Sequence, residues 1–219
     1  MGNLDFSIIY SSFPDLLIGS WITIKISTIS MMLGTLIGLI VGVIRGSMKN
    51  STLLLGAGIY LEVFRGTPLL IQLFFIYFGL PTIGISLSPW SASIIGLALN
   101  SGAYISEIVR AGIIGIDKGQ WEAARSLGLS HLQSISYIIL PQATRIILPP
   151  LVNTFSSLLK DSSLISILAI TELSRVGQLI YTKTFQPFEV YTVVGLLYLL
   201  MTSLLSYLSR LLEKKMIAY

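Results

Sequence analysis

Polar and ionisable side chains occur at a few places inside long apolar stretches of this sequence. In a membrane such side chains are costly unless they serve a solute, a partner or a reaction. One group follows helical spacing: Asn100, Tyr104 and Glu107 share a face at i, i+4 and i+7, with Arg110 one turn later. Two further groups are Thr67 with Pro68 and the run Lys160, Asp161 and Ser162. These residue types suit a solute path, and an acid beside a base also suits proton transfer in an enzyme.

Two acid and base pairs lie one helical turn apart. Glu62 and Arg65 are at i, i+3, as are Glu107 and Arg110. Opposite charges at this spacing neutralise each other locally, so we interpret both as structural ion pairs. For Lys160 and Asp161 two interpretations stay open: contact with a solute, or a structural pair.

The sequence carries no signature of nucleotide hydrolysis or of a known catalytic centre. There is no cysteine, which excludes disulfides and thiolate metal sites. G-x-x-x-x-G-K-[ST], H-E-x-x-H and G-x-S-x-G are all absent, so we expect no cofactor on this chain and no ATP hydrolysis by it. An intramembrane enzyme using Glu107, Lys160 or Asp161 is the weaker alternative, because no nucleophile converges with a base. His131, the one histidine, is expected to be a solvated helix residue.

The elements that must position these side chains are membrane-spanning helices. The chain has 219 residues, of which 53% are hydrophobic and 11% charged, a composition outside the soluble globular class. An all-α integral membrane protein is therefore expected, because a helix satisfies its own backbone hydrogen bonds in lipid. Five spans are predicted, at about 21–44, 53–80, 91–114, 146–170 and 191–212.

Glycine and proline modulate two of these spans. Gly34, Gly38, Gly42 and Gly46 form a stripe on one face of the first span, which favours close packing against another helix. Pro68 removes a backbone hydrogen bond within the second span, so we expect a kink there. The carbonyls freed by that kink could bind a solute.

Lysine and arginine counts orient the chain. The loops on the side of residues 45–49, 118–145 and the C-terminal end hold eight of them, whereas the opposite side has only Arg175 and Lys183. Because lysine and arginine are more frequent in cytoplasmic loops, this excess predicts a cytoplasmic C-terminus and an N-terminus outside. Residues 1–16 are then an extracytoplasmic segment, 214–219 a cytoplasmic tail, and 171–189 a surface helix. Acids at positions 5 and 15, where a signal peptide would be basic, lead us to expect that the first apolar run stays as an anchor.

One long stretch of mixed polarity, residues 119–143, separates the third and fourth spans. Good helix formers precede Gly128, which suits a left-handed helix end, and Ser130 with Gln133 fits a capping box that opens a second helix. We expect Pro141 to end that helix. Such a cytoplasmic hairpin suits the docking of a partner, the alternative being an ordinary amphipathic loop.

This hairpin carries a spaced set of residues, Glu122, Ala123, Ala124, Gly128, Ile138, Leu140 and Pro141. The set resembles the EAA loop of the membrane subunits of bacterial ABC importers. Three further stretches are similar to the polar amino acid permease branch of that family: FRGTPLLIQLFFIYFGLP at 64–81, NSGAYISEIVRAGI at 100–113 and LLKDSSLISI at 158–167. The resemblance covers about residues 17 to 213.

The resemblance implies a type I ABC importer transmembrane domain over residues 17–213. It implies that Glu122, Ala123, Ala124, Gly128, Leu140 and Pro141 couple the chain to a separate ATPase. Two copies of this chain, or this chain with a related permease, would pair with two ATPase subunits that bind Mg-ATP. An extracytoplasmic binding protein would deliver a polar amino acid for import across the prokaryotic plasma membrane.

The same resemblance implies a substrate pathway through Thr67, Pro68, Asn100, Ser101, Tyr104, Lys160, Asp161 and Ser162. The alternatives are another small solute or a passive channel, although a channel would not need the hairpin. Lipid surrounds the spans. No nucleic-acid partner is expected, because the basic residues are scattered between apolar runs.

Overall fold

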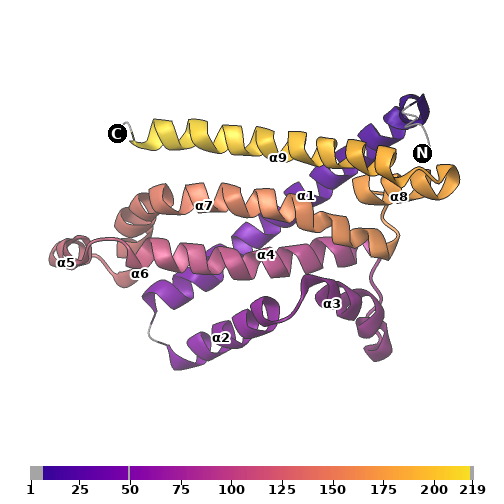
Figure 1. Ribbon diagram of the computed structural model, residues 1–219. Coiled ribbons are helices and arrows are strands. Elements are labelled where there is room, and N and C mark those ends of the chain that lie inside the picture. Colours follow the sequence, from indigo (N-terminus) through magenta and orange to yellow (C-terminus); the bar gives the residue numbers. More distant parts are fainter. Residues whose placement is uncertain (1–6, 49, 218–219) are drawn as a thin grey trace.

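The computed structural model describes residues 7–48 and 50–217, which are helical with short connections and contain no strand. Figure 1 shows long helices running along the molecule, with the first crossing the others diagonally. The α-helices are α1 (Ser7–Ser47), α2 (Ser51–Gly66), α3 (Leu69–Phe74), α4 (Pro89–Ile114), α5 (Lys118–Ser126), α6 (His131–Ser134), α7 (Leu140–Asp161), α8 (Leu173–Thr184) and α9 (Pro187–Ile217). Short π and 3-10 segments adjoin them at Phe75–Gly79, Leu80–Ile83, Ile135–Ile139 and Ser162–Leu168.

The predicted all-α membrane fold is confirmed, with one span broken. Four helical runs within the described residues are long and apolar enough to cross a membrane: Tyr10–Ser47, Pro89–Ile114, His131–Leu168 and Pro187–Leu211. The pair Ser51–Gly66 and Leu69–Ile83 is bent by 107° and makes a fifth span when taken together.

The centre of the fold is the packing of α1 against α4. A β-carbon added at Gly42 would lie 2.5 Å from Val109 Cβ, and one at Gly38 would lie 2.6 Å from Ile105 Cβ. The glycine stripe therefore faces α4 and lets the two backbones approach closely, as small residues do where no water drives association. Val109 and Ile105 are fully buried at this contact.

The first helix starts earlier than predicted. Residues 7–16 belong to α1 rather than to a loose N-terminal segment. Leu16 is fully buried against α8 and α9, and this burial stabilises the extra turns despite Pro14 within the helix. Its apolar cluster contains Leu173, Ile180, Val190 and Val194. The predicted surface helix over 171–189 corresponds to α8, which forms part of this cluster.

The predicted kink at Pro68 is a complete break. Thr67 and Pro68 are both extended, with ψ of 149° and 137°, because proline disfavours helical backbone at the residue before it. A carbonyl group near the C-terminal end of α2 accepts hydrogen bonds from side chains in place of the backbone. Phe64 O accepts hydrogen bonds from Gln72 Nε2 at 3.0 Å and from Asn100 Nδ2 at 3.1 Å.

The prediction that Pro141 ends a helix is wrong, and the helix that contains the predicted start of the fourth span at 146 begins earlier in the chain. The helical run continues from His131 to Leu168. Pro141 falls in the first turn of α7, directly after the π segment Ile135–Ile139, where the hydrogen-bond ladder changes register. A proline is tolerated where the backbone hydrogen bond that it would remove is already displaced.

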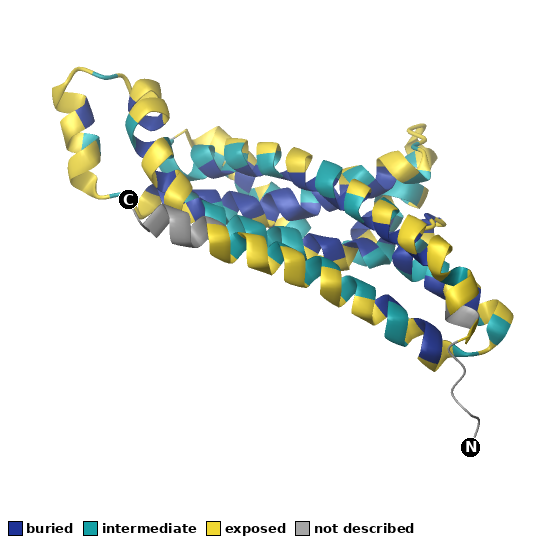
Figure 2. Cartoon of the chain, turned by 90° about the horizontal axis from the view of Figure 1, so that it is seen from above, coloured by how far each residue is buried: buried dark blue, intermediate teal, exposed yellow. Residues whose placement is uncertain are grey.

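The two ends of the molecule differ. Helices α5 and α6 and the C-terminal end of α9 lie at one end, whereas α8 and the start of α1 lie at the other (Figure 1). The α5–α6 hairpin projects from its end with most of its surface exposed (Figure 2).

Candidate functional site

A polar cavity of about 920 Å³ lies between the α2–α3 break, α4 and α7. The predicted pathway residues that line it are Thr67, Pro68, Asn100, Ser101, Tyr104 and Asp161. Its lining also includes residues that the sequence did not single out as pathway, among them Arg65, Asn153, Thr154 and Ser157. The helix break therefore opens a cavity against two intact spans.

Two carbonyl groups at the break, Phe64 O and Thr67 O, already accept hydrogen bonds from side chains of the protein. Gln72 Nε2 donates to Phe64 O and to Thr67 O, at 3.0 Å each. Asn100 donates to Phe64 O and, at 3.0 Å, to Gln72 Oε1. Both amides are buried. Asn100 and Gln72 thus hold the broken helix in place, and Asn100 positions the wall of the cavity.

Two other predicted residues have hydroxyls bonded within their own helix. Ser101 Oγ donates to Leu97 O at 2.7 Å and is 3% exposed. Thr67 Oγ1 donates to Val63 O at 2.7 Å and accepts from Gln72 Nε2 at 3.0 Å. These hydroxyls shape the cavity wall, and their donor hydrogens are already used.

The α7 side of the cavity follows a four-residue period. Asn153, Ser157 and Asp161 line the cavity at i, i+4 and i+8. Lys160 lies on another face, exposed, and Ser162 is fully buried with its hydroxyl donating to Leu159 O at 2.7 Å. The cavity lining includes neither of these two predicted residues. The spacing from Asp161 back to Asn153 was the sequence signal that identifies this face.

Asp161 forms no ion pair among the described residues. The recorded ion pairs all involve Glu107, and Asp161 and Lys160 take no part in them. Asp161 is exposed to the cavity that it lines. The charge of Lys160 acts on Asp161 from a longer distance, without an ion-pair contact between the two side chains.

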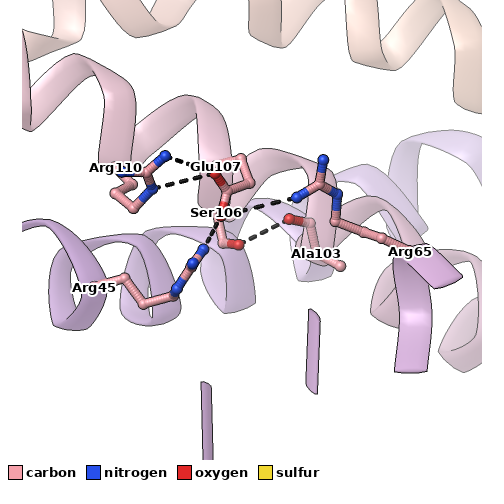
Figure 3. A network of polar contacts seen from close by, with 6 residues as sticks. All are labelled: Arg45, Arg65, Ala103, Ser106, Glu107 and Arg110. Atoms are coloured by element: carbon pink, nitrogen blue, oxygen red, sulfur yellow. Dashed lines mark hydrogen bonds and ion pairs between the residues drawn. The ribbon is translucent and has the colours of Figure 1, made fainter. Parts of the chain in front are cut away.

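Glu107 is the centre of a charged cluster (Figure 3). Arg110 donates to Glu107 Oε2 through Nε at 3.1 Å and Nη2 at 3.0 Å, so the predicted pair forms. Arg45 Nη1 contacts Glu107 Oε1, and Arg65 Nη1 lies 3.9 Å from that oxygen. The predicted pair of Glu62 with Arg65 does not form, because Arg65 extends toward Glu107 while Glu62 is exposed.

The hairpin is shaped by its caps. Asp117 accepts a hydrogen bond from Gly119 N at 2.7 Å at the start of α5. At its end Gly128 has φ of 75°, Gly128 N donates to Arg125 O at 2.9 Å and Leu129 N donates to Ala124 O at 3.1 Å. This is a Schellman motif, which a glycine in the left-handed conformation completes. The predicted capping box between Ser130 and Gln133 then opens the next helix.

Contacts tie the hairpin to the spans. His131 stacks on Trp121 with ring centroids 5.5 Å apart, and its Nε2 lies 2.9 Å from Ser47 O at the end of α1. Gln142 Nε2 donates to Gln120 Oε1 at 3.0 Å. The role of His131 as a tether was missed, because its partner is 84 positions away in the sequence. Of the predicted coupling residues, Glu122, Ala123, Gly128 and Pro141 are exposed, Leu140 is half-buried and Ala124 is buried.

A buried carboxyl group fixes the opposite end. Glu172 caps α8, accepting hydrogen bonds from Ser174 N at 2.9 Å and Arg175 N at 2.8 Å. Tyr198 of α9 donates to it at 2.8 Å, and Thr23 of α1 donates at 3.4 Å. Burial raises the pKa of Glu172 from its ordinary value, although these hydrogen bonds act in the opposite direction. Glu172 lies between two of the spans, and its carboxyl group joins α8 to α1 and α9.

Comparisons with known proteins agree with one another. The family described as "Binding-protein-dependent transport system inner membrane component" matches residues 34–218. The "Probable amino-acid ABC transporter permease protein YckA" of Bacillus subtilis (strain 168) is 43% identical, with 95% of this chain and 92% of that protein covered. The "Glutamine transport system permease protein GlnP" of Escherichia coli (strain K12) is 39% identical, with 97% of each chain covered.

Solved structures support the same fold. One chain of a structure described as "an amino acid ABC transporter with histidines" superposes with a TM-score of 0.89 at 38% identity, covering 98% of this chain and all 100% of that one. A chain of the MetNI methionine ABC transporter has a TM-score of 0.79 at 23% identity, covering 92% of this chain and 95% of that one, and shares the fold.

Proposed function

The chain belongs to the family of binding-protein-dependent transport system inner membrane components, and on that premise we propose that it is the subunit through which a polar amino acid enters the cell. As a permease subunit it is a multi-pass inner membrane protein and not itself an enzyme. The relatives described above carry amino-acid or glutamine transport in their names, which supports this substrate class.

The observation that carries the proposal is the cavity at the helix break. Its polar lining includes one carboxylate, Asp161, with no ion pair among the described residues. A carboxylate within a membrane protein is costly and usually faces a water-filled cavity or an opposite charge, and the ammonium group of an amino acid is such a charge. Asn153 and Ser157, on the same face of α7, offer hydrogen-bonding groups to the rest of a polar solute.

The exposed hairpin is the proposed docking surface for a cytoplasmic ATPase. We propose that two ATPase subunits bind Mg-ATP and a pair of permease chains, which are two copies of this one or this one with a relative. An extracytoplasmic binding protein delivers the amino acid. Glu122 lies in the middle of α5 with its side chain exposed, where it can pair with a basic residue of the ATPase.

Reconstituted transport tests the proposal. The chain is co-purified with its ATPase, placed in proteoliposomes with the binding protein, and assayed for uptake of L-glutamine and of each other standard amino acid. Saturable uptake that requires ATP is expected, and an ATPase whose nucleotide-binding lysine is replaced should abolish it. Uptake without ATP would indicate a passive channel instead. ATP-driven uptake confined to solutes other than amino acids would contradict the substrate class.

A further inference from the structure

A second cavity of about 320 Å³ adjoins the first. Arg65, Gly66 and Tyr104 line both cavities. The second is lined as well by Arg45, two residues before the end of α1 and therefore toward the hairpin end of the molecule. The guanidinium group of Arg65 lies 5.5 Å from the centre of the Tyr104 ring. These two side chains lie where the two cavities adjoin.

Arg65 is weakly held compared with its neighbours in the Glu107 cluster. Glu107 Oε2 already accepts two hydrogen bonds from Arg110, and Oε1 is contacted by Arg45 (Figure 3). Arg65 Nη1 stays 3.9 Å from Oε1, beyond hydrogen-bonding distance, and its side chain is 43% exposed. Glu107 therefore faces three guanidinium groups, and of these Arg65 is the least compensated by it. Glu62, which also lines the second cavity, forms no ion pair with Arg65.

The first cavity is lined by side chains of both charges. Asp161 and Arg65 are the two charged side chains in its described lining, and they have opposite signs. Arg65 comes from the last turn of α2 and Asp161 from the last turn of α7. An α-amino acid carries an ammonium and a carboxylate group, and a guanidinium group is the side chain that best matches a carboxylate because it can donate two parallel hydrogen bonds.

We propose that Arg65 binds the carboxylate of the transported amino acid and selects for it at the passage between the two cavities. This inference rests on the proposed function. Arg65 lines the second cavity as well as the first. A carboxylate bound to Arg65 therefore lies on the route by which the solute would leave toward the hairpin end. Glu107 serves as the resting partner of Arg65. The loss of this partner costs Glu107 little when the solute binds Arg65, since Arg45 contacts the same oxygen, Oε1, and continues to neutralise it.

Equilibrium binding to the permease–ATPase complex, without the binding protein, tests this assignment. Leaving out the binding protein matters because that protein makes its own selection among solutes. The probes are radiolabelled L-glutamine, or the amino acid taken up fastest in the experiment above, and the α-carboxamide of the same amino acid. The variants are Arg65→Gln and, as matched control, Arg110→Gln. The control removes the same charge from the same cluster but from a residue outside the lining of both cavities.

The wild-type complex should prefer the carboxylate over the carboxamide by about 10-fold or more, in line with hydrogen bonds between charged groups. Arg65→Gln should bind the two probes equally, whereas Arg110→Gln should retain the preference. If Arg65→Gln fails to assemble, Arg65→Lys replaces it, and the loss of the planar fork should reduce the preference. Two results would overturn this inference but not the proposed function. One is an assembled Arg65 variant that prefers the carboxylate as strongly as the wild type does. The other is a wild-type complex without this preference that still carries out ATP-driven amino acid uptake. Absence of that uptake would overturn the proposed function, and this inference with it.

Discussion

Asp161 shows how a charged side chain whose burial in a membrane protein is costly can indicate function. It lines the cavity without an ion pair among the described residues, whereas its neighbour Lys160 is exposed on another face. We predict that Asp161→Asn reduces the affinity for the transported amino acid by about 10-fold or more, because a charged hydrogen-bonding partner is lost. The measurement is uptake as a function of amino acid concentration.

Lys160→Gln is the matched control for this prediction. It removes the adjacent charge outside the cavity lining and should leave uptake within about two-fold of wild type. Assembly of both variants is followed by size-exclusion chromatography in detergent. Loss of assembly in Asp161→Asn would instead support a structural role for the carboxylate.

Glu172 should make stability depend on pH in a defined direction. Burial raises the pKa of Glu172 above its ordinary value of 4.5, so the folded protein binds the proton more tightly than the unfolded chain. The contribution of this group to stability is therefore full below pH 4.5 and decreases as pH rises toward the folded pKa. Compared with Glu172→Gln, which does not titrate, the wild type should lose thermal stability over the pH range above 4.5. A difference in melting temperature that stays constant over this range would contradict the prediction.

Of the two ion pairs predicted within one helix face, one forms, and the pairings across helices were not predictable from the sequence. Glu107 with Arg110 follows from their spacing of three residues. The contact of Arg45 with Glu107 depends on the register of α1 against α4, which no local spacing encodes. The exclusion of Lys160 from the cavity depends on which face of α7 turns inward.

At the scale of elements, the close approach of α1 and α4 depends on the absence of side chains. A β-carbon at Gly42 would meet Ser106 O at 2.7 Å, a backbone atom that cannot rotate away. We predict that Gly42→Ala destabilises the protein by about 1–3 kcal/mol, the usual effect of overpacking. Gly56, in α2, has nothing within 4 Å of such a carbon.

Gly56→Ala is the control for Gly42→Ala. It should be neutral or stabilise by up to about 1 kcal/mol, because alanine restricts the unfolded chain and favours helix. Thermal unfolding of the detergent-purified chain measures both substitutions. Equal effects at the two glycines would mean that the stripe does not determine the packing of α1 on α4.

The hairpin is the second element whose geometry depends on one glycine. At φ of 75° a side chain at Gly128 strains the backbone, which costs about 1 kcal/mol or more. We predict that Gly128→Asp leaves an inserted chain that loses the ATPase in pull-down or keeps it without solute-stimulated hydrolysis. If Gly128→Asp retains the ATPase and its solute-stimulated hydrolysis at normal levels, the hairpin is an ordinary loop and not a docking surface.

The hairpin also shows why element boundaries were harder to predict than element types. Its caps at Gly128 and Ser130 are local and were read from the sequence. The helix continues through Pro141 because of the π segment Ile135–Ile139, and no residue pattern in the sequence predicts that segment. Buried Ile135 and Ile139 hold that segment against the neighbouring helices, so packing overrides the usual effect of proline.

For the molecule as a whole, the fold separates two ends that the membrane would hold on opposite sides. The hairpin and the C-terminal end of α9 share one end, and α8 occupies the other (Figure 1). Arg175 and Lys183, the basic residues on the poorer side of the count, both lie in α8. The arrangement of the helices is therefore consistent with the tally of eight against two, which predicts a cytoplasmic hairpin and an outward N-terminus.

Cysteine labelling tests this orientation on a chain that has no native cysteine. Ser86 precedes α4 in the loop on the α8 side, and Ser126 lies at the end of α5 in the hairpin. Both are exposed, so a thiol at either place is accessible to reagent on its own side of the membrane. In intact cells, a membrane-impermeant maleimide should label Ser86→Cys and not Ser126→Cys, and permeabilised cells should show both. Labelling of Ser126→Cys alone from outside would invert the topology and place the proposed ATPase surface on the wrong side of the membrane.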